Sequence, residues 1–246
     1  MTSSSVQYGD AVASVYDSLI SAAVATGPSV ERLRPYVTGS RVLEIGVGTG
    51  RIAMPVAAIA AEVVGVDNSD PMLSVFRAKG VPGNVSLVEA DFRNELPVNG
   101  AFDAAYSTLG SLACVRSREE LVGALSHVRD VLKPGGSLSF EYYAKQAYEP
   151  LLAQHSVTFP DTRGGGLVTV TATVDEGDLL TLGTRIEANE ENGENTVPAV
   201  EFSERVLLIG HEEVESCVAA AGFAVEGVDL GGGLSPYGWY TVRSTG

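Results

Sequence analysis

Three glycines at alternate positions follow a short apolar segment near the start of the chain. The segment reads Val42-Leu-Glu-Ile-Gly-Val-Gly-Thr-Gly50, and a helical pattern comes after it. Only glycine lets a chain turn tightly there and bring its backbone against a ligand. We therefore expect a cofactor to lie over this turn.

A carboxylate follows the next predicted strand, which ends in Gly65-Val-Asp67. In folds that bind adenosyl cofactors, an acidic residue about 20 residues after the glycines accepts hydrogen bonds from the ribose hydroxyls. We predict that Asp67 takes this role, and we include the adjacent Asn68 among the cofactor-binding residues.

The glycine spacing also bears on which nucleotide binds. The dinucleotide fingerprint requires a further glycine at the position that Arg51 occupies, so pyrophosphate binding is disfavoured. A nucleotide-dependent dehydrogenase or a non-catalytic adenosyl-binding module is a competing interpretation. The spacing and the lack of a dehydrogenase-like second domain both weaken it.

At these residues the chain resembles the class I S-adenosylmethionine (SAM)-dependent methyltransferases. The first motif of that family is an acidic residue followed by Gly-x-Gly-x-Gly, which Glu44, Gly46, Gly48 and Gly50 match. The resemblance implies that these four residues bind SAM. Methyl transfer from a sulfonium is an in-line displacement at an activated carbon, so no metal is expected.

Two further segments match the family in the correct order. In Glu89-Ala-Asp-Phe92, the resemblance implies that Asp91 takes the adenine amino group and that Phe92 packs on the ring. It also puts the loop that begins at Ser107 beneath the methionine part of the cofactor and beside the acceptor. We therefore count Ser107 as both cofactor-binding and catalytic.

Additional features extend the resemblance along the chain. Lys133-Pro-Gly-Gly136 precedes the fifth strand, and Ala220-Ala-Gly-Phe223 is typical of the last helix. Apart from this last segment, the motifs cover roughly residues 35 to 145. Four motifs in the right order are hard to obtain by chance.

Two tyrosines near the amino terminus are candidates for chemistry at the acceptor. Tyr8 and Tyr16 lie about two helical turns apart, so both can face one site. The chain is similar in layout to small-molecule N-methyltransferases of antibiotic biosynthesis, which act on aminosugar or lincosamide nitrogens. In these enzymes a tyrosine-containing helix closes over the cofactor and a β-rich insert frames the acceptor. We assign Tyr8 and Tyr16 as catalytic on this basis.

The acceptor is expected beyond the fifth strand, because ligands of open α/β sheets bind at the carboxyl ends of the strands. Tyr142, Tyr143 and His155 are the substrate-binding candidates there. The favoured reaction is methyl transfer to an aliphatic amine nitrogen. The alternative is a small-molecule O-methyltransferase that uses His155 as its base, since a hydroxyl often needs one.

Methylation of a planar nitrogen in protein or RNA is disfavoured. Enzymes of that kind carry Asn-Pro-Pro-Tyr or Asp-Pro-Pro-Tyr where this chain has Ser107-Thr-Leu-Gly110.

Strand and helix patterns alternate from Arg41 to Tyr142, which predicts a parallel sheet covered on both faces. Helical patterns over Val6–Val24 and Ser29–Pro35 precede it. The expected fold is a Rossmann-like α/β methyltransferase sheet of seven strands, with N-terminal helices and an antiparallel β insert after the fifth strand. It forms one domain, 1–246, divided into a helical cap (1–35), a cofactor-binding core (36–150), the insert (151–210) and a closing helix with strands (211–246).

Composition restricts the partners. The net charge is −15 and the 16 Lys and Arg residues are scattered, so nucleic acid is an unfavourable partner. No apolar run is long enough to span a bilayer, and Met1–Ser5 lacks the features of a leader, so we expect a cytoplasmic protein with no membrane partner. The expected partner is a small-molecule acceptor, and the sequence leaves homo-oligomerisation open.

Overall fold

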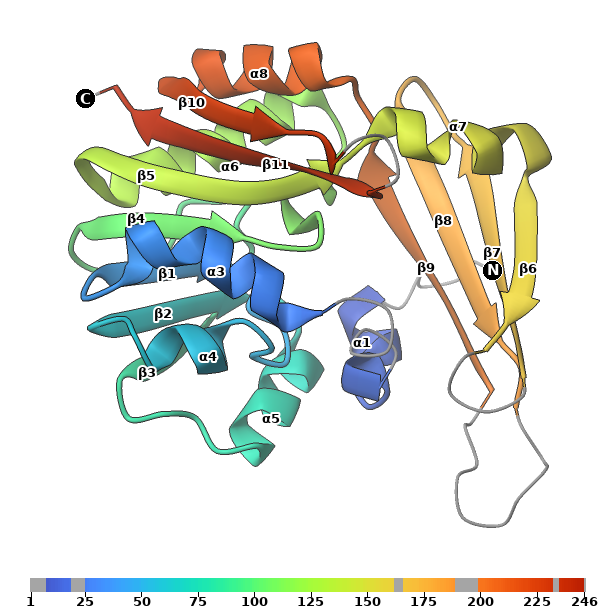
Figure 1. Cartoon of the computed structure of the whole chain (residues 1–246), viewed down its shortest axis with the longest axis horizontal. Coiled ribbons are helices and arrows are strands. Elements are labelled where there is room, and N and C mark those ends of the chain that lie inside the picture. Colours follow the sequence, from blue (N-terminus) through green and yellow to red (C-terminus); the bar gives the residue numbers. More distant parts are fainter. Residues whose placement is uncertain (1–7, 19–24, 162–165, 189–198, 232–234, 246) are drawn as a thin grey trace.

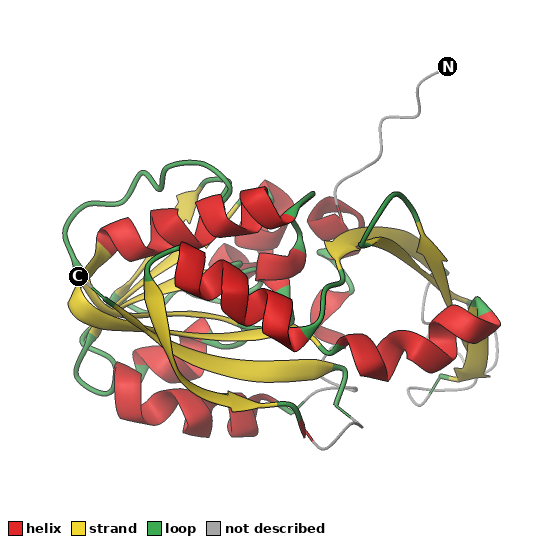
Figure 2. Cartoon of the chain, turned by 90° about the horizontal axis from the view of Figure 1, so that it is seen from above, coloured by secondary structure: helices red, strands yellow, loops and turns green. Residues whose placement is uncertain are grey.

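The computed structural model describes residues 8–18, 25–161, 166–188, 199–231 and 235–245. It contains two sheets with helices arranged around the larger one (Figures 1 and 2). The helices are α1 (Tyr8–Val12), α3 (Thr26–Val37), α4 (Ala53–Ala57), α5 (Asp70–Ala78), the 3-10 helix η1 (Ser111–Ala113), α6 (Arg118–Val131), α7 (Lys145–Gln154) and α8 (His211–Ala220). The strands are β1 (Arg41–Ile45), β2 (Glu62–Asp67), β3 (Val85–Glu89), β4 (Phe102–Ser107), β5 (Leu132–Tyr143), β6 (Ser156–Pro160), β7 (Leu167–Val174), β8 (Leu179–Ile186), β9 (Val200–Leu207), β10 (Phe223–Asp229) and β11 (Tyr237–Ser244).

The main sheet has seven strands in the order β10-β11-β5-β4-β1-β2-β3. The strands from β5 to β3 are parallel, whereas β11 runs antiparallel to both β5 and β10. The strand order switches at β1, since β2 and β3 are added on one side of it and β4 and β5 on the other. The expected seven-stranded methyltransferase sheet is thus confirmed, and the crevice at the carboxyl ends of β1 and β4 is where this topology binds ligands.

Helices cover both faces of the main sheet, because the central strands alternate between two apolar surfaces. Val42 of β1 packs with α3, α4 and α5 on one face. Leu43 and Ile45 pack with η1 and α6 on the other. This two-sided burial explains why β1 is apolar along nearly its whole length. None of the described helices is long and apolar enough to cross a membrane.

The N-terminal helices differ from expectation in their bounds. The helix expected over Val6–Val24 lies partly outside the described residues, and within them α1 ends at Val12, with a turn before the chain becomes helical again at Tyr16. The expected stop at Pro35 was wrong, since α3 continues through Pro35 to Val37. Val37 is fully buried, and its packing against the sheet outweighs the disruption that proline causes.

The insert is a second sheet of four antiparallel strands, β6-β7-β8-β9. Helix α7, which the sequence patterns did not indicate, leads into it from β5. In Figure 1 this sheet stands beside the carboxyl ends of the main-sheet strands, and α1 lies between the two. Contacts of α1 with both β9 and α5 agree with that view. The insert therefore walls the crevice on the side away from the main sheet.

Candidate functional site

A cavity of about 1500 Å³ lies between the carboxyl ends of the main-sheet strands and the insert. The glycine turn, the N-terminal segment and the inner side of β6–β9 all contribute to its lining. Of the residues expected to be catalytic or to bind cofactor or substrate, the cavity is lined by Tyr8, Tyr16, Gly46, Gly48, Asp67, Asn68, Phe92 and Tyr143. The fold thus brings together residues that are up to 135 positions apart in the sequence (8 and 143).

The glycine turn is held by the Asp67 carboxylate. Gly48 donates its backbone N–H to Asp67 Oδ2 at 2.8 Å, and Ser69 donates its own to Asp67 Oδ1 at 2.9 Å. Gly48 has φ 51°, in the left-handed region that favours glycine. Gly50 has φ 81° and lies against Phe76, whose ring would be 2.5 Å from an added Cβ, so its role here is in packing.

The residues at this end of the cavity match the chemistry of an adenosyl group. Asp67 offers carboxylate oxygens to hydroxyls, Asn68 offers an amide, and Phe92 offers an aromatic face. The backbone of Gly46 and Gly48 forms the adjoining wall without side chains in the way. This donor set fits SAM.

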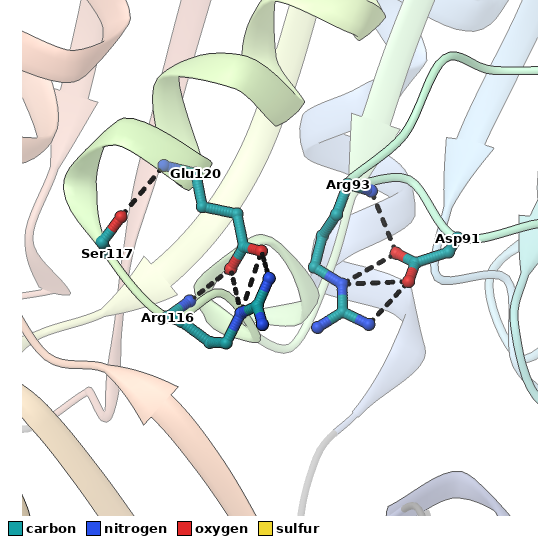
Figure 3. A network of polar contacts seen from close by, with 5 residues as sticks. All are labelled: Asp91, Arg93, Arg116, Ser117 and Glu120. Atoms are coloured by element: carbon teal, nitrogen blue, oxygen red, sulfur yellow. Dashed lines mark hydrogen bonds and ion pairs between the residues drawn. The ribbon is translucent and has the colours of Figure 1, made fainter.

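Asp91 is engaged in a local ion pair in the structure. Arg93 Nε and Nη2 approach the Asp91 carboxylate, the closer contact being 2.6 Å, and the Arg93 N–H also donates to it (Figure 3). This arrangement lowers the pKa of Asp91. Arg93 lines the cavity and Asp91 does not. The Arg116–Glu120 pair lies beside them, with the Ser117 cap on α6.

Glu44 lies behind the cavity wall. Its side chain is 2% exposed, and Tyr106 Oη donates to Glu44 Oε2 at 2.8 Å. Burial raises the pKa of Glu44 to about 8, although the Tyr106 bond opposes this shift. In the described structure Glu44 thus joins β1 to β4 and does not line the cavity.

Tyr8 and Tyr16 both line the cavity, as their spacing suggested. The Tyr8 ring meets Phe202 of β9 edge to face, with centroids 5.4 Å apart. Burial raises the pKa of each tyrosine, so both hydroxyls stay protonated at neutral pH. The pair joins the cofactor side of the cavity to the insert.

Three further candidates do not line the cavity. Ser107 is fully buried and donates its hydroxyl to the Ile45 carbonyl at 3.0 Å, which cross-links β4 to β1. Tyr142 is also fully buried, and its hydroxyl donates to the Leu207 carbonyl. His155 is exposed in the left-handed conformation at the end of α7. Alternation along β5 turns Tyr143 into the cavity and Tyr142 away from it.

Comparison with known proteins gives the family. A family model described as a methyltransferase domain matches residues 42–136. The cypemycin N-terminal methyltransferase of a Streptomyces species is 30% identical over 242 residues, which cover 96% of this chain and 94% of the relative. The chain belongs to the SAM-dependent methyltransferases.

Solved methyltransferase structures share its fold. SAM-bound CalS10, an amino pentose methyltransferase from Micromonospora echinaspora, has a TM-score of 0.73 at 20% identity, covering 94% of this chain and 97% of that one. The sugar N-methyltransferase KedS8 from a Streptoalloteichus species has a TM-score of 0.71 at 19% identity, covering 100% and 99%. The family excludes the dehydrogenase interpretation, and SAM is the methyl donor.

The methyltransferase cavity also contains residues that the sequence patterns did not single out. Glu204 of β9 accepts a hydrogen bond from Tyr143 Oη at 3.0 Å, and Tyr237 lies beside Tyr143 with ring centroids 5.0 Å apart. A weak signal for Glu204 was present. It follows Phe202 and precedes Val206 at period two, which places a carboxylate on the inward face of a strand.

Proposed function

We propose that this methyltransferase transfers the methyl group of SAM to an aliphatic amine nitrogen of a small molecule, such as an intermediate of antibiotic biosynthesis. The observation that carries the proposal is the charge of the cavity lining. Among the described residues, its acidic side chains are Asp67, Asp161, Asp175, Glu176 and Glu204. Arg93 and Arg205 also line it, but each pairs with an aspartate, at 2.6 and 2.9 Å. The negative excess favours a cationic amine over a neutral or anionic acceptor.

The lining offers little support for the O-methyltransferase alternative. No histidine is among the described residues that line the cavity, and His155 is exposed outside it. The histidine base that this alternative names is therefore not at the cavity.

SAM supplies a methyl group that its sulfonium has already activated. The chain's own contribution is to hold and shield the reactants. Asp67, Asn68 and Phe92 are proposed to bind the adenosyl part, with Gly46 and Gly48 beside them. Tyr8 and Tyr16 are proposed to orient the acceptor and keep water out, while Tyr143 lines the acceptor side. Asp91 is proposed to bind the adenine amino group only after its ion pair with Arg93 breaks.

The four predicted segments, 1–35, 36–150, 151–210 and 211–246, are proposed to act as one domain. Residues from the first three line the same cavity, as does Tyr237 of the fourth. The cavity thus depends on the whole chain.

A peptide α-amine is a second candidate acceptor. The cavity exceeds the roughly 300–1,000 Å³ of common ligand sites and continues along the insert past Val168 and Ile186. A relative that matches nearly the full chain is named for N-terminal methylation of cypemycin. A peptide acceptor in an extended conformation could occupy the part of the cavity that runs along the insert.

The test is a methylation assay with product mass as the readout. The panel pairs glucosamine with glucose, and a free short peptide with its N-acetylated form, and adds phenol. We expect a mass gain of one methyl group only on compounds with a free amine. Methylation confined to hydroxyl compounds would overturn the amine proposal, and the two pairs separate sugar from peptide acceptors.

A further inference from the structure

Glu204 is a cavity carboxylate whose negative charge no described cationic side chain neutralises. Glu204 lies on β9, on the strand face shared by Phe202 and Val206, and it lines the cavity. Its single described hydrogen bond comes from Tyr143 Oη at 3.0 Å. Within the described residues no lysine, arginine or histidine forms an ion pair with it, and the neighbouring Arg205 pairs with Asp175 instead.

The titratable groups of the described chain that interact electrostatically with Glu204 come from several of the elements around the cavity. They are tyrosine hydroxyls and one thiol, none of them cationic: Tyr8, Tyr16, Cys114, Tyr143, Tyr148 and Tyr237. Three of these rings are packed together, since Tyr143 lies 5.3 Å from Tyr148 and 5.0 Å from Tyr237 between centroids. Burial raises the pKa of Cys114 to about 12, so the thiol is also neutral.

A partly buried carboxylate that has one hydrogen-bond donor and no cation among the described residues is costly for the fold. A ligand cation would compensate for the missing partner. Aromatic rings around the carboxylate favour the same ligand, because their faces attract ammonium groups. The arrangement therefore suits a substrate that carries a protonated amine.

We propose that the Glu204 carboxylate binds the ammonium group of the acceptor and takes its proton before methyl transfer. This inference rests on the amine acceptor proposed above and names the residue that selects it.

The proton transfer is within reach at neutral pH. Burial raises the pKa of Glu204 to about 7, which suits a base near the operating pH. An alkylammonium with a pKa near that of lysine, about 10.4, would lie about three units higher, roughly a thousandfold penalty in the equilibrium. Desolvation in the cavity lowers the pKa of the ammonium and reduces that penalty.

One N–H bond of the ammonium breaks, its proton forms the O–H bond of Glu204, and the nitrogen keeps the electron pair. That pair forms the bond to the methyl carbon, while the electrons of the breaking carbon–sulfur bond stay on sulfur. The product leaves as an N-methylammonium ion, and Glu204 returns its proton to water.

The kinetic test compares Glu204→Gln with Glu201→Gln, a control at an exposed position on the same strand. The substrate is whichever amine of the panel the wild type methylates. We expect Glu204→Gln to lower kcat/KM at pH 7 by about a hundredfold or more and to move the acidic limb of the pH profile up to the pKa of the amine itself, because only free amine can then react. Glu204→Asp should keep the acidic limb of the wild type at a lower rate, and Glu201→Gln should match the wild type.

A binding test needs no turnover. In protein labelled with ¹³C at glutamate carboxyls, the resonance missing from Glu204→Gln identifies Glu204. We expect this resonance to titrate near pH 7, and the apparent pKa to fall when ethylammonium is added but not when ethanol is added. If the apparent pKa of the Glu204 resonance does not change when ethylammonium is added, the proposed binding role is wrong.

The kinetic outcomes separate the two proposals. If the wild type methylates an amine and Glu204→Gln keeps its rate and pH profile, Glu204 is not the base and the amine function stands. If only hydroxyl compounds are methylated, the proposed function fails, and the inference about the acceptor's proton fails with it. Matching unfolding curves for the variants exclude misfolding as the cause of lost activity.

Discussion

The Thr49 hydroxyl donates a hydrogen bond to Asp17 Oδ1 at 2.5 Å, and this contact joins the N-terminal segment to the glycine turn. Lys79 pairs with the other Asp17 oxygen from the end of α5. On its opposite side the segment touches the insert through Tyr8 and Phe202. Residues 8–18 therefore connect the cofactor side of the cavity to the acceptor side, with Asp17 as the main polar attachment.

Replacing Asp17 by alanine should loosen this segment without unfolding the protein. A charge-assisted hydrogen bond contributes roughly 1.5–3 kcal/mol, so we expect kcat to fall about tenfold or more. Amide exchange of residues 8–18 should accelerate, while the unfolding midpoint changes little because both partners of the Lys79 pair are partly exposed. The control is Glu31→Gln, which breaks an exposed pair with Arg34. Unchanged exchange rates would rule out Asp17 as the attachment.

Asp67→Ala should weaken SAM binding. The loss of a charged acceptor corresponds to about 1–3 kcal/mol, or roughly 5- to 150-fold in Kd. Because Asp67 also accepts the N–H groups of Gly48 and Ser69, the variant should lose some stability as well. Calorimetric titration with SAM, at a temperature where both proteins are folded, measures the affinity directly. An unaltered Kd would show that the ribose is bound elsewhere.

Much of the main fold follows from local patterns. Period-two and helical spacing locate the strands and helices of the core, and the glycines with Asp67 locate the cofactor end. These features are local because each depends on one turn or one strand end. Pro35 shows the limit of such reasoning, since its penalty in α3 is offset by burial of Val37, which is a tertiary contact.

The acceptor side could not be predicted as well. Glu204 reaches the cavity only through the pairing of β9 with β8 and the docking of the insert against Tyr143. Adjacent residues also separate there, with Tyr142 bonded to Leu207 in the core while Tyr143 faces the cavity. Sequence gives the alternation along each strand, but register and packing decide which face meets the site.

Glu44 should make stability depend on pH. Its pKa is about 8 in the folded protein against an ordinary value of 4.5, so the folded state holds a proton that the unfolded state releases. Its contribution is therefore fully present below about pH 4.5 and is lost as pH rises through about 8, by up to about 1.4 kcal/mol per pH unit. Glu44→Gln, which can still accept the Tyr106 bond, should flatten this slope in urea unfolding series. Glu212→Gln, at an exposed position, should keep the wild-type slope, and a wild-type slope in Glu44→Gln would contradict the raised pKa.

Tyr8→Phe and Tyr16→Phe should each lower turnover while leaving stability within about 0.5–1.5 kcal/mol of the wild type, the usual effect of losing one neutral hydrogen bond. Both residues line the cavity, and a phenylalanine at position 8 would keep the ring contact with Phe202. Steady-state kinetics on the identified acceptor, alongside thermal unfolding, separates the two effects. His155→Ala serves as the comparison, and its turnover should match that of the wild type. Full activity in both phenylalanine variants would leave the tyrosines with a packing role only.

Gly110→Ala should disturb the acceptor side of the cavity through Tyr143. Gly110 has φ 75°, and an added Cβ would lie 2.4 Å from the Tyr143 ring. Left-handed backbone costs a non-glycine residue about 1–2 kcal/mol, and overpacking adds about 1–3 kcal/mol. The ring must shift, which alters the Tyr143–Glu204 hydrogen bond, so KM for the acceptor should rise more than the Kd for SAM.

Gly123→Ala is the matched control for Gly110→Ala, because Gly123 lies within helix α6 and an added Cβ there meets nothing within 4 Å. It should stabilise the protein by about 0.4–1 kcal/mol. Equal changes in acceptor KM and SAM Kd for Gly110→Ala would indicate that the disturbance spreads across the whole cavity and is not confined to the acceptor side.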